Sequence, residues 1–257
     1  MRRYVADKKP PSRARELLLP GVDETSRSDG SRWGGLLSYW LSEGASVTTK
    51  FPRFRQIAMN AQKVIAIAYG VTQLLEDAPA FEGHMRRALG SELAFQLDNC
   101  NLKGSGAGQP LGITNATATI SIAKETGQAA SSLVYENLGK MWSRLPAPCR
   151  RRATWLCNEV GRVYLTVGAS GSVPRVYTPA GANRNADALL YGRPVLAVEQ
   201  APTLGNIGDI CLADLSQYVI LSGPLQAAMS ADVAFLADEA VFRFVLRVDG
   251  EPLWAST

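Results

Sequence analysis

Three glycines spaced two residues apart could form a phosphate-binding loop. Gly104, Gly106 and Gly108 lie in the stretch KGSGAGQPLG, and the backbone N–H groups of a glycine loop bind phosphate when a strand precedes it and a helix follows. Here a predicted helix precedes the glycines, Gln109 and Pro110 follow, and no Gly-Lys-Ser/Thr motif completes a nucleotide site. A tight turn with positive-φ glycines is therefore favoured, and a nucleotide-binding enzyme is the remote alternative function.

A catalytic set based on histidine would have to include His84, the only histidine in the chain. No Gly-x-Ser-x-Gly motif or similar nucleophile signature accompanies it, which favours a surface or core histidine on a helix. The acidic pair Glu76 and Asp77 precedes a predicted helix, where carboxylates offset the helix dipole. The pair Asp238 and Glu239 leads into the last strand and is expected to be solvated. We therefore predict no enzyme activity and no catalytic residues.

Metal and disulfide chemistry are also disfavoured. The four cysteines are far apart, with no Cys-x-x-Cys pair, and a single histidine cannot complete the usual zinc ligand sets. We expect reduced, mostly buried thiols, no metal and no cofactor. The cysteines are Cys100, Cys149, Cys157 and Cys211.

Length and hydrophobicity indicate a folded protein. The chain has 257 residues, of which 46% are hydrophobic, so it can bury a substantial core. No window approaches the roughly 18 to 20 apolar residues of a membrane span. The basic N-terminus is not followed by the apolar run of a signal peptide. A cytosolic product without a membrane partner is expected.

The net charge of +4 is concentrated at the N-terminus. Residues 1–15 carry six basic side chains against Asp7 alone, a net charge of +5, so the other 242 residues sum to −1. Such an arm binds nucleic acid or an acidic partner surface, or is simply solvated. Arg150, Arg151 and Arg152 form a second candidate anion patch, with solvation or local pairing as the alternative. The basic residues of the arm are Arg2, Arg3, Lys8, Lys9, Arg13 and Arg15.

Hydrophobic patterning predicts an arm, a hairpin, a strand and a long helix in the first half. Residues 1–33 contain prolines, glycines and only one short apolar cluster, residues 17–19, which suits an arm. Residues 34–60 suit two extended arms of a hairpin with little core of its own. Residues 63–69 are apolar on both faces and predict a buried strand. Residues 80–101 predict a helix with an apolar stripe and a Glu82–Arg86 pair, ending near Gly104.

The second half interleaves strands and helices without a regular βαβ rhythm. One helix spans residues 135–145, and short strands are expected at 153–157, 194–198, 210–215 and 218–221. Asn158 is expected to cap a further helix. Residues 242–248 predict a strand with one apolar face and one face bearing Arg243 and Arg247, closed by a turn at Asp249 and Gly250. The fold class is α+β.

Five segments, taken in order, resemble the major capsid proteins of tailed bacteriophages, which have the Hong Kong 97-type fold. They are KVIAIAYGVTQLLEDAP (63–79), NLKGSGAGQPLGI (101–113), ATWLCNEVGRVYLT (153–166), LLYGRPVLAVEQAP (189–202) with GDICLADLSQYVI (208–220), and FRFVLRVDGEPL (242–253). The resemblance covers about residues 60–257.

The resemblance implies a layout. It assigns residues 1–33 to an N-terminal arm, 34–60 to an extended loop, 61–132 and 222–257 to a peripheral domain with its spine helix at about 80–101, and 133–221 to an axial domain. An arm without a fold and a hairpin without a core then make sense, because neighbouring subunits complete them.

The resemblance also implies a function, with no catalysis. Copies would assemble into pentamers and hexamers of an icosahedral virion shell that encloses double-stranded DNA, formed in the host cytoplasm. An encapsulin-like nanocompartment shell is the alternative. Many relatives begin with a scaffold domain that is later removed, so scaffolding is expected from a separate protein, or the chain is a processed form. A portal is expected as a further partner, and a decoration protein is compatible with the resemblance.

Candidate contact residues follow from this layout. The basic arm is expected to contact neighbouring subunits or the DNA backbone. The hypothesis for the extended loop is that its cations pair with acidic residues of a neighbour. The subunit-contact candidates are Lys50, Arg53, Arg55, Trp40, Arg243 and Arg247.

Overall fold

A computed structural model shows two compact units. Apart from a few terminal residues, the first unit comprises Asp7–Ala116 with Val219–Ser256, and the second comprises Thr117–Tyr218. Both units mix helices and strands, which confirms the α+β class. The structure describes residues 6–8, 16–22, 35–44, 46, 51–71, 79–161, 177–180, 188–234 and 239–254.

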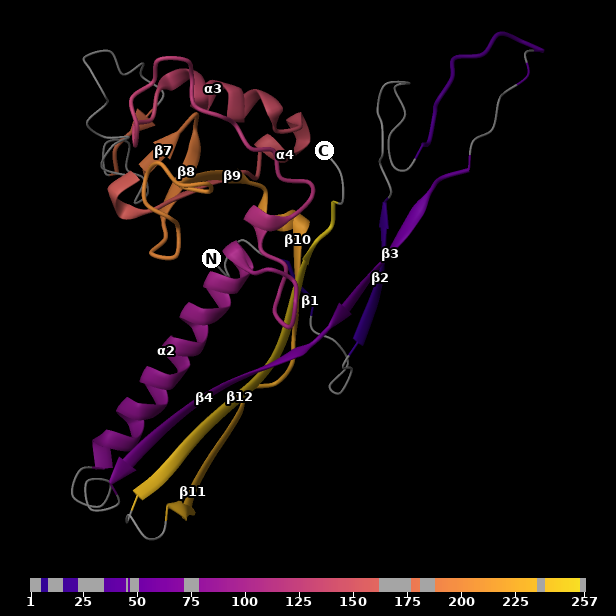
Figure 1. Ribbon diagram of the computed structural model, residues 1–257. Coiled ribbons are helices and arrows are strands. Elements are labelled where there is room, and N and C mark those ends of the chain that lie inside the picture. Colours follow the sequence, from indigo (N-terminus) through magenta and orange to yellow (C-terminus); the bar gives the residue numbers. More distant parts are fainter. Residues whose placement is uncertain are drawn as a thin grey trace. The chain divides into compact units, whose positions relative to one another are not determined.

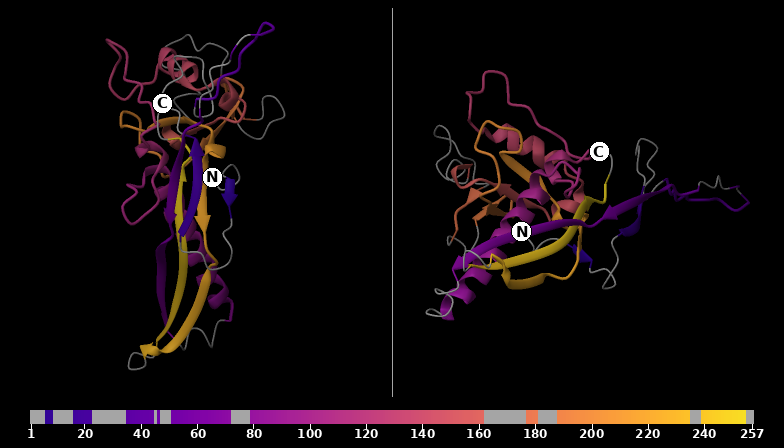
Figure 2. Two further views of the ribbon diagram at one scale, coloured as in Figure 1. Left: turned by 90° about the vertical axis from the view of Figure 1, so that its right-hand side faces the viewer. Right: turned by 60° about the horizontal axis from the view of Figure 1, so that its bottom comes forward.

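A five-stranded sheet organises the first unit (Figure 1). The long strand β12 pairs antiparallel with β4 along one edge, from Glu239 opposite Val71 to Val248 opposite Gln62. It also pairs antiparallel with β11, and the long strands lie side by side in both views of Figure 2. The strands of this sheet are β1 (Ala6–Lys8), β10 (Tyr218–Ser222), β12 (Glu239–Pro252), β11 (Gln226–Ala234) and β4 (Gln62–Val71).

Helix α2 (Pro79–Lys103) covers one face of this sheet, as the apolar stripe predicts. Leu89 and Leu93 pack with Phe242 and Phe244 of β12, and burial of each such side chain stabilises the fold by about 1.5–3 kcal/mol. Val64, Ala66 and Ala68 of β4 complete this contact. The predicted helix is confirmed, and so is its Glu82–Arg86 ion pair, at 2.6 Å.

Strand β4 is present as predicted, but the expectation that both its faces are buried is wrong. Alternate residues face α2, whereas Ile65, Ile67 and Tyr69 remain 44%, 53% and 61% exposed. Helix α2 lies on one side of the sheet, and the other side stays open at these three residues of β4.

The strand formed within residues 34–60 has a partner from outside this range, which differs from the expected hairpin. Strand β3 (Phe54–Asn60) takes as its antiparallel partner β2 (Glu16–Val22), from the segment expected to be an arm. Ile57 and Met59 of β3 are buried against Val219 and Leu221 of β10. The apolar residues at 17–19 therefore belong to a two-stranded ribbon that rests on the sheet through β3.

The expectation of a turn at Asp249 and Gly250 is also wrong, because β12 continues through both residues to Pro252. The Asp249 carboxylate accepts hydrogen bonds from the backbone N–H groups of Asn60 and Gly250. The Gly250 carbonyl accepts one from the Leu111 N–H. Neighbouring segments thus hold this Asp-Gly pair in strand conformation.

The glycine-rich segment after α2 is a tight turn, as predicted. Gly106 and Gly108 have φ values of 79° and 71°, which favour glycine. A Cβ atom on Gly104 would lie 2.1 Å from the Pro110 carbonyl oxygen. Since α2 runs directly into this turn, the strand required before a phosphate-binding loop is missing here.

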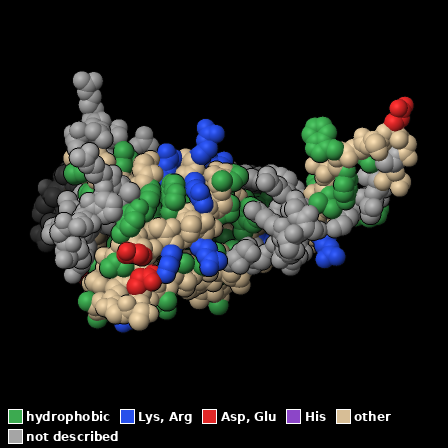
Figure 3. All heavy atoms as spheres, turned by 90° about the horizontal axis from the view of Figure 1, so that it is seen from above, with side chains coloured by type: hydrophobic (Ala, Val, Ile, Leu, Met, Phe, Trp, Pro, Cys, Tyr) green, Lys and Arg blue, Asp and Glu red, His purple; other side chains and the backbone are tan. Residues whose placement is uncertain are grey.

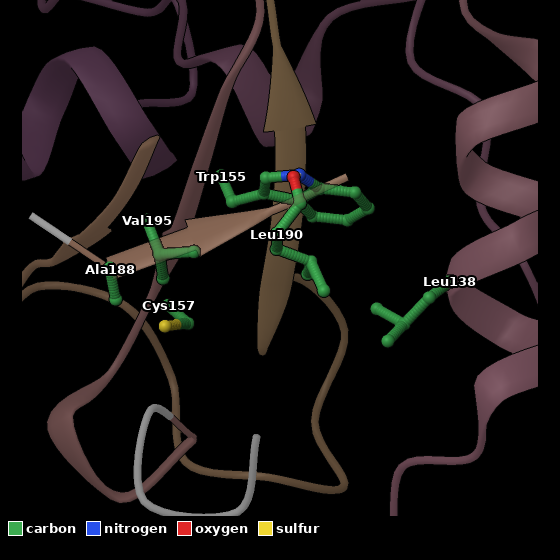
Figure 4. Close-up of a cluster of buried hydrophobic side chains, with 6 residues drawn as sticks. All are labelled: Leu138, Trp155, Cys157, Ala188, Leu190 and Val195. Atoms are coloured by element: carbon green, nitrogen blue, oxygen red, sulfur yellow. The ribbon is translucent and has the colours of Figure 1, made fainter. Parts of the chain in front are cut away.

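The second unit is built on a sheet in the order β6, β7, β8, β5, β9. Trp155 is fully buried, and its indole N–H donates to the Leu190 carbonyl at 3.0 Å. Figure 4 shows it in a cluster with Leu138 of α3 and Val195 of β8. The elements of this unit are α3 (Tyr135–Arg144), α4 (Ala147–Arg150), β5 (Thr154–Cys157), β6 (Tyr177–Thr178), β7 (Ala188–Leu190), β8 (Arg193–Ala197), β9 (Ile210–Ala213) and η3 (Leu215–Gln217).

Several local expectations for the second half of the chain are confirmed. The predicted helix at 135–145 is α3, and the strands at 153–157, 194–198, 210–215 and 218–221 are β5, β8, β9 and β10. The Asn158 side chain accepts the Val160 N–H at 3.2 Å, as a helix cap does.

All four cysteines are described and none forms a disulfide. Among the described helices, none is long and apolar enough to cross a membrane.

Candidate functional site

The extended segment between β2 and β3, together with the first residue of β3, exposes large apolar side chains. Trp40 is 105% exposed and Phe51 is 90% exposed. Figure 3 shows hydrophobic side chains along this segment, at the right of the view. Exposed apolar residues gathered in this way mark an interaction site. We call this set the apolar loop surface; it comprises Leu36, Tyr39, Trp40, Leu41, Phe51 and Phe54.

The sheet of the first unit has a second exposed apolar surface, on the side away from α2. The antiparallel register places Arg243 opposite Ile67 and Arg247 opposite Lys63, and directly opposed residues share a face. No ion pair with a described residue is formed by the three cations. We call this the outer sheet face; it comprises Lys63, Ile65, Ile67, Tyr69, Arg243 and Arg247.

Arg55 is engaged within its own chain. Its Nη2 donates to the carbonyl oxygens of Leu253, at 2.8 Å, and Pro252, at 3.3 Å. The side chain therefore ties β3 to the end of β12. Burial and the nearby Asp249 carboxylate raise the pKa of Glu251, and the Arg55 guanidinium opposes this shift.

Asp249 forms a second link between β3 and β12, and we call the contacts of Arg55 and Asp249 the polar joint. The sequence did not identify Asp249 as a candidate site residue. Its Oδ2 accepts the Asn60 N–H at 2.7 Å, and its Oδ1 accepts the Gly250 N–H at 2.8 Å. Burial raises the pKa of the Asp249 carboxyl, and these two hydrogen bonds oppose the shift. The only sequence signal was the Asp-Gly pair, which indicated a turn.

The remaining predicted site residues are distributed as follows. Arg53 and Trp40 are exposed on the extended segment, and Arg243 and Arg247 are exposed on the outer sheet face. His84 is exposed on α2. Lys8 ends β1, but its side chain lies outside what is described. The other candidates fall outside the described residues: Lys50, Arg2, Arg3, Lys9, Arg13 and Arg15.

These two exposed surfaces, on a sheet with one long covering helix, suit a subunit that is completed by its neighbours. A family model described as the phage capsid family matches residues 20–256. The chain belongs to the phage capsid family. This confirms the resemblance seen in the sequence and makes the chain a capsid shell protein.

Solved capsid structures share the fold of this phage capsid protein. The capsid of a native GTA particle, computed with C5 symmetry, is 20% identical with a TM-score of 0.76, over 98% of this chain and 85% of that one. A chain of Microbacterium phage Oxtober96 is 14% identical with a TM-score of 0.66, over 97% and 83%. A chain of the bacteriophage PhiM1 mature capsid is 9% identical with a TM-score of 0.59, over 97% and 83%. No curated protein sequence matches the chain. The Hong Kong 97-type fold is confirmed.

Proposed function

We propose that the chain is a major capsid protein whose copies form the pentamers and hexamers of an icosahedral shell around double-stranded DNA. The observation that carries this proposal is the pair of exposed apolar surfaces in a member of the phage capsid family. A monomer gains nothing from solvated tryptophan and isoleucine side chains, so both surfaces are typical of interaction sites.

The apolar loop surface of one copy and the outer sheet face of the next are suited to each other. Full burial of a large apolar side chain contributes about 1.5–3 kcal/mol, so Trp40, Ile67 and Tyr69 together supply substantial association energy. Glu43 lies beside the apolar loop surface and is complementary to the cations of the outer sheet face. A contact between two different surfaces, repeated around a ring, closes into a capsomer.

The charged candidates have separate roles in this proposal. Lys50 and Arg53 pair with acidic residues of a neighbour, and Arg243 and Arg247 belong to the receiving face. Arg55 acts from within, because it already binds the carbonyls at the end of β12. The basic arm lies along neighbours or toward the packaged DNA. A separate scaffolding protein and a portal are the further partners.

Substitution at the apolar loop surface tests this proposal. Trp40→Asp is expected to abolish shells in sedimentation velocity, with an unchanged free energy of unfolding of the unassembled chain. Ile207→Asp is the matched control, because Ile207 is 87% exposed in the second unit, and it is expected to leave shells intact. Shells of normal size from Trp40→Asp would contradict the proposal. DNA in purified shells supports the virion assignment, whereas protein cargo would favour the encapsulin-like alternative.

A further inference from the structure

We infer that five arginines in the second unit form a binding surface for the phosphate backbone of double-stranded DNA. This inference rests on the proposed function for the identity of the DNA, while the surface itself follows from the geometry. The arginines come from the end of α3, from α4 with the turn after it, and from the start of β8. We call them the arginine patch: Arg144, Arg150, Arg151, Arg152 and Arg193.

Three of the five arginines hold these segments together. Arg150 donates from Nε to the Leu145 carbonyl at 2.9 Å and from Nη2 to the Ser143 carbonyl at 3.0 Å. Arg193 donates from Nη1 to the Arg151 carbonyl. Arg152 forms an ion pair with Asp214, with Nη2 and Oδ2 3.3 Å apart. The patch is therefore positioned before any ligand arrives.

Aromatic side chains stiffen the support beneath the patch. The Arg150 guanidinium lies 5.7 Å from the ring centroid of Trp142. The Trp142 ring stacks on Tyr191, with centroids 5.3 Å apart and planes 12° apart. Tyr191 continues the stack to Trp155 of the core. Guanidinium groups on a fixed platform lose little conformational freedom on binding.

Donor groups remain available for a ligand. Arg144 and Arg151 are exposed, and neither side chain has a hydrogen bond or ion pair with a described residue. Each guanidinium carries five N–H donors and binds phosphate through two parallel hydrogen bonds. Arg150 and Arg193 use only part of their donors on carbonyl oxygens.

The charge of the patch is strongly positive. Among the described residues, the carboxylate that contacts these arginines is Asp214, whose side chain is only 3% exposed and forms an ion pair with Arg152. Five guanidinium groups against this carboxylate leave a net charge of +4. Figure 3 shows Lys and Arg side chains gathered on the face where α3 and α4 lie.

A second copy of the chain is a poor ligand for this patch. Its carboxylates occur in runs of two at most, such as Glu76 with Asp77 and Asp238 with Glu239. A DNA duplex instead offers one negative charge about every 1.7 Å along its axis. Duplex DNA therefore matches the charge density of five clustered arginines.

The salt dependence of DNA binding tests the inference. A short labelled duplex of mixed sequence is titrated with the unassembled full-length chain, and fluorescence anisotropy gives the association constant at several salt concentrations. The slope of log K against log salt is negative, and each lost phosphate contact reduces its magnitude by about 0.9. Arg144→Gln with Arg151→Gln is therefore expected to reduce the magnitude of the slope by about 2, while Arg144→Lys with Arg151→Lys preserves it.

The control is Arg87→Gln with Lys124→Gln, which removes two exposed cations elsewhere and is expected to leave the slope unchanged. Equal slopes for wild type and Arg144→Gln/Arg151→Gln would overturn the inference. If that variant binds DNA normally but forms no shells, the patch contacts another copy, and the inference is again overturned. Failure of the wild type to form shells would contradict the proposed function without affecting the comparison of slopes.

Discussion

The backbone N–H of Asn60 donates a 2.7 Å hydrogen bond to the carboxylate of Asp249, although 189 residues separate the two in the chain. Asn60 ends β3 and Asp249 lies near the end of β12. The bond therefore fixes the strand that leads out of the extended segment to the central strand of the sheet. Arg55 reinforces the same joint through the carbonyls of Pro252 and Leu253.

Asp249→Ala is expected to destabilise the unassembled chain by about 1–3 kcal/mol, because the N–H groups of Asn60 and Gly250 lose their buried acceptor. Urea unfolding measures this difference. The control is Asp232→Ala on β11, where the side chain is exposed and the expected change is within about 0.5 kcal/mol. Equal stabilities for the two variants would show that the joint contributes nothing.

The pH dependence of stability is expected to follow two carboxyls with raised pKa values, Asp249 and Glu251, and the contribution of Glu251 can be tested by itself. Its pKa is raised in the folded chain by burial and by the Asp249 carboxylate, so the folded state binds the proton more tightly than the unfolded state. The corresponding stability is present below the ordinary pKa of glutamate and is lost as pH rises through the raised pKa. Glu251→Gln should thus be more stable than wild type at neutral pH and equal to it in acid, by urea unfolding at both values. A constant difference would contradict this.

Two glycines give opposite expectations for the same substitution. A Cβ on Gly112 would lie 2.4 Å from the backbone N of Gly104, so Gly112→Ala should cost at least about 2 kcal/mol. A Cβ on Gly90 of α2 meets nothing within 4 Å, and Gly90→Ala should stabilise the helix by about 0.5–1 kcal/mol. Thermal unfolding of both variants checks the turn after α2. A tolerated Gly112→Ala would mean that this close packing is absent.

The orientation of α2 predicts that alanine substitution at two neighbouring positions lowers the free energy of unfolding by different amounts. Leu93 is 4% exposed, whereas Phe95 is 38% exposed. Leu93→Ala should therefore cost about 2–5 kcal/mol through the cavity it leaves, and Phe95→Ala should cost much less. Denaturant unfolding of the unassembled chain distinguishes them. The reverse order would mean that the helix presents its other face to the sheet.

Local sequence patterns correctly predicted those helices and strands whose apolar residues recur with a single dominant period. The stripe through Leu89, Leu93 and Leu97 identified α2, because residues four apart share a helix face. The alternation around Phe242 and Phe244 identified β12 in the same way. Both patterns depend only on near neighbours in the chain, so the sequence contained the necessary information.

The errors all involve partners that are distant in sequence. The pairing of β3 with β2 joins residues such as Ile57 and Leu19, and no local pattern identifies that partner. Apolar residues on both faces of β4 indicated double burial, because composition does not reveal that α2 covers only one face. Asp249 was interpreted as a turn residue, since its acceptor role depends on Asn60 from another strand.

The candidate contact residues were partly accessible from the sequence. Trp40, Arg243 and Arg247 were singled out, and all three are exposed. Arg55 was grouped with them by charge alone, but backbone carbonyls of its own chain engage it. Such contacts leave no trace in the pattern of charges.

Electron microscopy of the purified chain tests the central claim most directly. If the chain is a major capsid protein, a reconstruction will show closed icosahedral shells, with the segment around Trp40 lying on the Ile65, Ile67 and Tyr69 face of the neighbouring copy. Monomers or small oligomers, under conditions in which the chain is folded and concentrated, would contradict the account.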